Sequence, residues 1–204
     1  VMALFSLCVL YILALCLRKN ILFLVAVLVS LLCFSVPFIT HLVPQPFHVF
    51  RVRLEQHVKL PDSVIHRVYV YDHLLDLIGQ KPLTGFGLGT TKVLQGRGEY
   101  IAELPQQRLE LLPLHPHNNI LHVWLELGLL GIVAFFAMFL RLLTSLAYIK
   151  ERELFAVAIA SCGAYFVIGL FNYSLWSGWW IIVALFLALF IVILQKISLQ
   201  ITHR

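Results

Sequence analysis

Five long apolar runs dominate the pattern of hydrophobic and polar positions, at residues 1–17, 21–40, 119–140, 154–171 and 175–194. A helix needs about 20 apolar residues, with a range of about 17 to 25, to cross the hydrocarbon core of a bilayer. We therefore predict about five transmembrane helices. The first run lacks the basic leading region and the small-residue cleavage site of a signal peptide, so we interpret it as a span that is cut into at its start.

The last two runs belong to one uncharged stretch, from Leu154 to Gln195. This stretch is too long for a single crossing of the membrane. The polar cluster Asn172-Tyr173-Ser174 divides it. We therefore predict a helical hairpin with a tight turn at this cluster.

Composition places the whole chain in the membrane class. Of its 204 residues, 61% are hydrophobic and 12% are charged, and the mean hydropathy is +0.92. A soluble domain carries about 25% charged residues, so composition excludes a soluble domain, a disordered chain and a secreted disulfide scaffold. The four cysteines lie in apolar runs and are expected to be small buried hydrophobes. The net charge of +5 does not indicate a nucleic-acid partner in such a chain.

Lysine and arginine in short loops predict the orientation, because they favour the cytoplasmic side. They follow the first, third and fifth runs, at Arg18, Lys19, Arg141, Lys150, Arg152, Lys196 and Arg204. The opposite, outer side then holds residues 44–118 and an aromatic belt of Trp176, Trp179 and Trp180. We accordingly divide the chain into two spans over residues 1–43, an outer loop over 44–118 and three spans over 119–204.

The outer loop is long enough to be either functional or disordered, and it contains signals of order. An apolar stripe repeats at helical spacing, at Val64, Val68, Tyr71, Leu75 and Ile78. Asp62 or Ser63 can cap a helix here, and Gly79 can end it. We predict an amphipathic helix over residues 63–78 that lies at the membrane surface; a helix that only covers the bundle is the alternative. Arg67 projects from its first turn, off the stripe.

A glycine-rich segment follows, with Gly85, Gly87 and Gly89 at alternate positions after Pro82. The spacing could indicate a phosphate-binding loop, but no apolar strand precedes it and no clear helix follows it. We interpret it as a structural turn in which the backbone makes a close approach. Residues 90–113 are predicted to be irregular, and no role is assigned there.

Candidate chemistry gathers just before the third run, in the sequence His115-Pro116-His117-Asn118. A zinc site needs three or four ligands, and only His122 follows nearby, so we expect no metal. A histidine at a helix N-terminus can act as a general base, because the helix dipole disfavours its protonated form. The residues alone leave open whether His117 is such a base or only caps the helix.

Glu126 is the one acidic residue inside the predicted spans. An ionisable group there is costly and usually faces the bundle interior or a polar cavity. His122 lies one turn earlier on the same face, so we predict that the two side chains pair. A structural pair and a role in a substrate path are both open.

The sequence around His117 resembles that of a known family. His117-Asn118 is followed by nine residues and then by Gly128 and Gly131. This spacing resembles the signature of the O-antigen ligase and polymerase superfamily of bacterial envelopes. The segment from Arg67 to Gly89 is also similar to the family's helix and Pro-x-x-Gly-x-Gly-x-Gly turn.

The resemblance implies an all-α integral membrane glycosyltransferase of GT-C-like fold, located in the bacterial inner membrane with its large loop in the periplasm. It implies that His117 is the base that acts on an acceptor hydroxyl and that Arg67 holds the donor pyrophosphate. We assign their neighbours in the motif, His115 and Asn118, to substrate binding. The implied donor is a glycan on undecaprenyl pyrophosphate and the implied acceptor is lipid A-core. No cofactor and no metal are implied.

Family members also have additional spans and a second essential arginine in an earlier loop, so the resemblance implies that this chain is a C-terminal half whose partner is the missing N-terminal half. A repeat-unit polymerase or a protein O-oligosaccharyltransferase would use the same chemistry on another acceptor. A transporter is the alternative from another class. It would be expected to show broken spans and ionisable groups near the midplane, where only His122 and Glu126 qualify.

Overall fold

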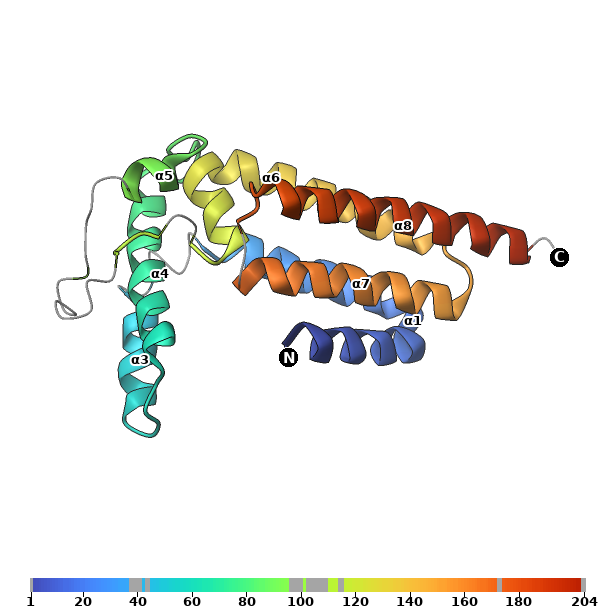
Figure 1. Ribbon diagram of the computed structural model, residues 1–204, viewed down its shortest axis with the longest axis horizontal. Helices are drawn as coiled ribbons and strands as arrows, with labels where there is room; N and C mark the ends of the chain where they lie inside the picture. Colours follow the sequence, from blue (N-terminus) through green and yellow to red (C-terminus); the bar gives the residue numbers. More distant parts are fainter. Residues whose placement is uncertain are drawn as a thin grey trace. The chain divides into compact units, whose positions relative to one another are not determined.

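The computed structural model describes residues 2–36, 42, 45–95, 101, 110–113, 116–171 and 174–202, and this part is helical (Figure 1). The chain forms two compact units. Residues 1–31 and 135–204 make one, here called the bundle unit, and residues 32–134 make the other, the loop unit. Helices α1 (Met2–Phe34) and α6 (Asn119–Ala147) each contribute residues to both. These units do not test the predicted division by membrane side.

The bundle unit consists of most of α1, the second half of α6, α7 (Arg152–Phe171) and α8 (Gly178–Thr202). Its core is apolar and comprises Ala14, Ile21, Leu143, Leu146, Ile149, Phe155, Ala156, Ala158, Ile159, Cys162, Ile191 and Leu194. Small residues on α7 let neighbouring helices approach closely, which is the usual basis of helix association in lipid. At Gly163, a methyl group would overlap the side chain of Leu10 on α1.

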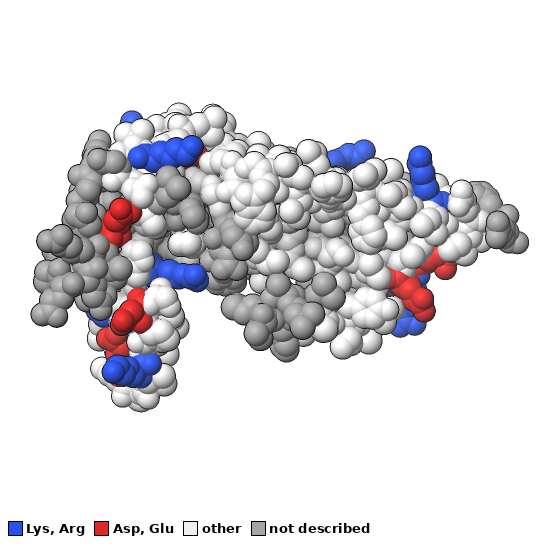
Figure 2. All heavy atoms as spheres, in the orientation of Figure 1, with Lys and Arg blue, Asp and Glu red and all other residues white. Residues whose placement is uncertain are grey.

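Several polar contacts of the bundle unit involve the segment between α6 and α7 and the first residue of α7. The guanidinium of Arg152 donates to the carbonyl of Leu15. The hydroxyl oxygen of Ser198 accepts hydrogen bonds from the backbone N–H groups of Lys150 (2.8 Å) and Glu151 (3.3 Å). Figure 2 shows charged side chains toward the end of this unit that carries the C-terminus, and a mostly uncharged flank along α8. Such a flank suits contact with lipid tails.

Three helices are long and apolar enough to cross a membrane among the described residues: Asn119–Ala147, Arg152–Leu170 and Gly178–Ile201. They coincide with the third, fourth and fifth predicted spans, which are confirmed as long apolar helices. The first two predicted spans fall largely within α1, which continues through Arg18 and Lys19 as helix. In Figure 1 the ribbon of α1 runs away from the N-terminus and then back. Five spans and a GT-C-like fold stay predictions.

Two expectations about exposed and buried side chains need correction. Trp176 and Trp179 are exposed, as an interfacial belt requires, but Trp180 is only 4% exposed. It is buried because its ring stacks on Tyr165 at a centroid distance of 4.2 Å. Cys33 and Cys162 are buried as expected, whereas Cys8 and Cys16 are exposed. An apolar run therefore does not imply burial within the protein when one helix face can meet lipid.

The loop unit contains α3 (Pro46–Glu55), α4 (Asp62–Gln80), α5 (Thr90–Gln95) and the first half of α6. Helices α3 and α4 pack on each other. Helix α3 is absent from the sequence predictions. The free N–H groups of its first turn are hydrogen-bonded by a side chain from another helix. The carboxylate of Asp72 on α4 accepts hydrogen bonds from the backbone N–H groups of Phe47 (3.0 Å) and His48 (2.7 Å). A carboxylate is favourable there because helix N-termini carry partial positive charge.

Helix α4 confirms the predicted amphipathic helix, with corrections at both ends. Pro61 occupies the N-cap position without a side-chain hydrogen bond, so neither Asp62 nor Ser63 caps the helix. The helix also continues through Gly79 to Gln80, because Gly79 does not adopt the left-handed conformation with which a glycine ends a helix. Its buried side chains are Val68, Val70, Asp72, Leu74, Leu75 and Ile78, whereas Val64 is exposed. A position at the membrane surface stays a prediction.

Candidate functional site

The proposed base, His117, lies directly before the N-terminus of α6. Its backbone has φ 51°, in the left-handed region that few residues other than glycine adopt. Asn118 fills the capping role: its Oδ1 accepts hydrogen bonds from the N–H groups of Ile120 (3.0 Å) and Leu121 (3.2 Å). Asn118 therefore supplies a side-chain cap of α6, and the role of His117 as the base stays a prediction. The side chain of His117 is partly exposed.

Helix α4 reaches His117 through Tyr71, whose hydroxyl donates a hydrogen bond of 3.0 Å to the backbone carbonyl of His117. Arg67 stands one helical turn before Tyr71 on the same helix. Burial raises the pKa of Tyr71, and the positive charge of Arg67 opposes that rise in part. The structure therefore brings together the helix face that carries Arg67 and the backbone of His117, the two positions that the family resemblance singled out.

The segment that leads to His117 is held by α4 a second time and by α5. The imidazole Nε2 of His66 on α4 lies 2.8 Å from the carbonyl oxygen of Glu110. The side-chain amide of Gln95 on α5 donates to the carboxylate of Glu110 at 3.0 Å. The prediction that residues 90–113 are irregular is thus wrong for the first six, which form α5.

The glycine-rich turn is inserted into a break in α6. At Gly128 the helix has φ 59° and ψ −154°, which interrupts its hydrogen bonding. The turn replaces the lost partners: the N–H groups of Phe86 and Gly87 donate to the carbonyls of Leu125 (2.8 Å) and Glu126 (2.9 Å). In return, the N–H groups of Leu129 (2.9 Å) and Leu130 (3.4 Å) donate to carbonyls of Pro82 and Leu83.

This contact explains two glycines of the motif. A methyl group on Gly85 would lie 2.5 Å from the backbone carbon of Glu126, and one on Gly128 would lie 2.6 Å from the backbone nitrogen of Gly85. Both glycines also have positive φ. The interpretation of the segment as a structural turn with close backbone approach is confirmed.

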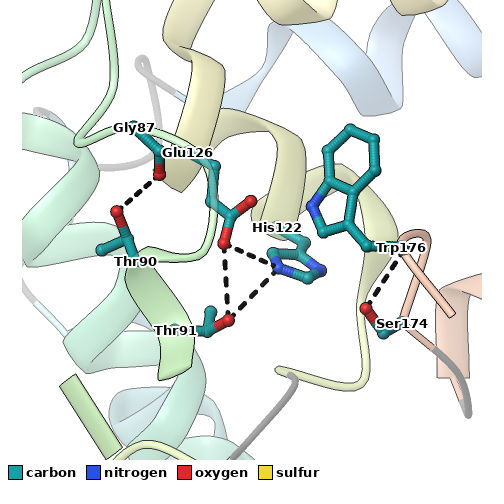
Figure 3. A network of polar contacts seen from close by, with 7 residues as sticks. All are labelled: Gly87, Thr90, Thr91, His122, Glu126, Ser174 and Trp176. Atoms are coloured by element: carbon teal, nitrogen blue, oxygen red, sulfur yellow. Dashed lines mark hydrogen bonds and ion pairs between the residues drawn. The ribbon is translucent and has the colours of Figure 1, made fainter. Parts of the chain in front are cut away.

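Beside the break, three polar side chains form a buried network (Figure 3). Nε2 of His122 lies 3.3 Å from Oε1 of Glu126, and the two side chains are 2% and 0% exposed. The hydroxyl of Thr91, from α5, donates to the same oxygen at 3.4 Å and lies 3.5 Å from His122 Nε2. The predicted pairing of His122 with Glu126 is confirmed. Thr91 adds a link to α5 that ties the turn to α6 a second time.

The remaining predicted site residues differ in outcome. His115 lies outside the described residues, as do Arg97 and Arg108. The side-chain oxygen of Asn118 is engaged with its own helix, and its assignment to substrate binding stays a prediction. Within the described part of the chain, no group of three or more His, Cys, Asp or Glu side chains is placed to hold a metal ion.

Sequence reasoning missed two side chains that organise the site. Tyr71 was counted as a member of the apolar stripe of α4, although its hydroxyl contacts His117. Asp72 was not singled out, although it is the cap of α3. A carboxylate within a predicted buried stretch is a signal that could have identified Asp72. No local signal distinguishes a tyrosine that packs from one that also positions a neighbour.

Comparison with known proteins gives consistent matches. The profile of a family described as O-antigen ligase matches residues 1–136. The chain is similar to a protein of Rickettsia conorii named "Putative polysaccharide ligase", with 30% identity over 127 residues, which are 62% of this chain and 31% of the relative. Proteins of the same name are similar to it in two further species. In Rickettsia typhi the identity is 30% over 142 residues, which are 70% of this chain and 35% of the relative. In Rickettsia bellii it is 31% over 134 residues, which are 66% of this chain and 33% of the relative. The chain thus spans about a third of these relatives. No solved structure matches it significantly.

Proposed function

This chain belongs to the O-antigen ligase family, and from that premise we propose that it is part of a membrane glycosyltransferase that moves a glycan from undecaprenyl pyrophosphate to an acceptor hydroxyl. The observation that carries the proposal is the hydrogen bond from Tyr71 to His117, since it joins the helix of Arg67 to the proposed base. A cation for the leaving group and a base for the nucleophile then belong to one rigid arrangement within the loop unit.

In the proposed reaction, the imidazole of His117 accepts the proton of the acceptor hydroxyl as that oxygen attacks the anomeric carbon. The bond between the anomeric carbon and the pyrophosphate oxygen breaks, and undecaprenyl pyrophosphate leaves with the bonding electron pair. The guanidinium of Arg67 can form two parallel hydrogen bonds to phosphate oxygens and so stabilise the developing negative charge. Attack from the face opposite the leaving group gives inversion at the anomeric carbon. Fixed cations suffice for this role, so the proposed mechanism needs no metal.

We further propose lipid A-core as the acceptor, which makes the reaction a step of lipopolysaccharide synthesis. A repeat-unit polymerase and a protein O-oligosaccharyltransferase differ from this in the acceptor and not in the chemistry. Membranes that contain the complete protein, supplied with lipid-linked donor, separate these cases. Modification of lipid A-core supports the ligase, longer lipid-linked glycans support the polymerase, and glycosylated protein supports the third. If none of the three acceptors yields a product, the proposal of an enzyme is contradicted.

A transporter remains the second candidate, because α6 is broken beside a buried ionisable pair, as expected for that class. The break, however, is filled by the backbone of the glycine-rich turn, which hydrogen-bonds the carbonyl and N–H groups of α6 that the break leaves without helical partners. A transporter would need those groups to face a substrate cavity. Movement of the lipid-linked glycan across vesicles without formation of a glycosidic bond would favour the transporter.

The proposed location is the bacterial inner membrane, with the loop unit's α3 and α4 in the periplasm. Reporter fusions test this orientation. Alkaline phosphatase should be active when fused after Gly89, because it folds only outside the cytoplasm, and inactive when fused after Lys150. The reverse pattern would contradict the proposed topology.

A further inference from the structure

Tyr71 connects two helices through one polar atom and one ring edge. Its hydroxyl donates to the carbonyl of His117, 46 positions away in the sequence. Its ring meets the ring of Phe47 edge to face, with centroids 5.3 Å apart and planes at 65°. Phe47 in turn donates its backbone N–H to Asp72, the residue after Tyr71. The ring of Tyr71 is therefore held against Phe47 of α3, independently of the hydrogen bond from its hydroxyl to His117.

His117 needs such support, because its backbone conformation is intrinsically unfavourable. A residue other than glycine in the left-handed region persists only where the surrounding structure holds it. Two contacts hold the peptide that joins His117 to Asn118: Asn118 is fixed as the cap of α6, and the carbonyl of His117 is fixed by Tyr71. The orientation of this peptide limits the directions in which the imidazole can leave the backbone.

We propose that Tyr71 is a positioning residue for the base: its hydroxyl holds the backbone of His117 left-handed and thereby sets the direction of the imidazole toward the acceptor. The inference rests on the proposed function, since it presupposes that His117 is the base. Burial keeps the pKa of the Tyr71 hydroxyl above its usual range. The hydroxyl therefore remains a proton donor throughout the pH range in which a histidine titrates.

The role differs from that of Arg67, although both residues lie on the same face of α4. Arg67 is proposed to contact the donor pyrophosphate, whereas the hydroxyl of Tyr71 is already engaged with the protein backbone. Loss of Arg67 should weaken stabilisation of the leaving group. Loss of the Tyr71 hydroxyl should leave donor binding intact and misplace the base.

The test is Tyr71→Phe in the complete protein, with Tyr69→Phe as matched control. The control also removes a tyrosine hydroxyl from α4, but at Tyr69, whose ring faces Arg51 and His48 of α3. Three quantities are measured in purified, reconstituted protein: kcat, KM for lipid-linked donor, and donor-binding capacity per mole of protein. For Tyr71→Phe we expect kcat to fall about fivefold, the equivalent of about 1 kcal/mol, with KM and binding capacity unchanged. Tyr69→Phe should match wild type in all three.

Two results would overturn the inference. One is an unchanged kcat in Tyr71→Phe. The other is a loss of binding capacity in proportion to kcat, which would indicate that part of the protein is misfolded rather than that the base is misplaced. His117→Ala is measured in parallel to separate the two proposals. An inactive His117→Ala beside a normal Tyr71→Phe removes only the role of Tyr71, whereas a fully active His117→Ala removes the base assignment and the role of Tyr71 with it.

Discussion

The two units of this chain are stabilised in different ways. The bundle unit is held by apolar side chains on long helices, with polar contacts at the segment between α6 and α7 and at the first residue of α7. The loop unit has short helices whose ends and breaks are satisfied by groups distant in sequence, such as Asp72 for α3 and the glycine-rich turn for α6. It also contains both described residues other than glycine with positive φ, Gln45 and His117.

The difference suits the bundle unit to anchoring in the membrane and the loop unit to chemistry. Apolar packing tolerates changes of side chain, because each of its many similar contacts contributes only a small part of the stability. A backbone hydrogen bond between two fixed segments tolerates almost none, since a lost partner leaves a buried polar group unsatisfied. A site that must hold a base and a cation in fixed positions benefits from the second kind of structure. We therefore expect substitutions in the loop unit to have the larger and more specific effects.

The largest effect is expected from Gly85→Ala. The added methyl group would overlap the backbone of Glu126 at 2.5 Å, where neither segment can move without breaking hydrogen bonds. We expect the folded protein to be lost, as measured by size-exclusion chromatography of the solubilised protein. Gly79→Ala is the control: it lies within α4 with open space around it, and it should gain up to about 1 kcal/mol. Equal behaviour of the two variants would contradict the inserted turn.

The next largest effect should come from the buried pair. Glu126→Ala removes the carboxylate that His122 and Thr91 contact, and loss of a buried hydrogen-bond partner costs about 1 to 3 kcal/mol for each group left unsatisfied. Glu126→Gln should cost less, because an amide oxygen can still accept from Thr91. Thermal unfolding in detergent measures both, with the exposed carboxylate of Glu153 on α7 as control in Glu153→Ala. A Glu126→Ala variant as stable as Glu153→Ala would show that the network contributes nothing.

Arg67→Lys should impair transfer while leaving the fold intact. Lysine keeps the charge but cannot form the paired hydrogen bonds of a guanidinium. Loss of a charge-assisted contact costs about 1.5 to 3 kcal/mol, or roughly tenfold to a hundredfold in rate. The control is Arg53→Lys on the exposed face of α3. If Arg67 only anchors its helix to lipid headgroups, the lysine variant will be nearly as active as wild type.

Asp72→Asn should have a smaller effect, of about 1 kcal/mol, because one amide N–H of α3 loses its acceptor. Burial raises the pKa of Asp72 above its ordinary value near 3.8, and this outweighs the two hydrogen bonds that lower it. The folded state then binds this proton more tightly than the unfolded state, so stability falls as pH rises from about 3.8 to the raised value. Unfolding measured at pH 4 and pH 7 should show a larger advantage of wild type over Asp72→Asn at pH 4. A larger advantage of wild type at pH 7 would mean that folding lowers the pKa of Asp72, which would contradict this prediction.

The bundle unit was more predictable from the sequence than the loop unit, for a physical reason. Hydropathy is a sum over neighbouring residues, so α7 and α8 are visible in any window of the sequence. The pairing of His122 with Glu126 was also predictable, because the residues are one helical turn apart. The partners of Gly85, Asp72 and Tyr71 lie far away in the chain, and no periodicity predicts them.

His117 is proposed to be the base of the glycan transfer. The most direct measurement is the initial rate of transfer from lipid-linked donor by His117→Asn in the complete protein. Asparagine tolerates the left-handed conformation of this position but cannot accept a proton near neutral pH. His57→Ala, at an exposed histidine of the loop unit, is the control. If His117 is the base, His117→Asn should give no transfer although its level in the membrane is normal. Transfer at a rate close to that of wild type would show that His117 is not the base.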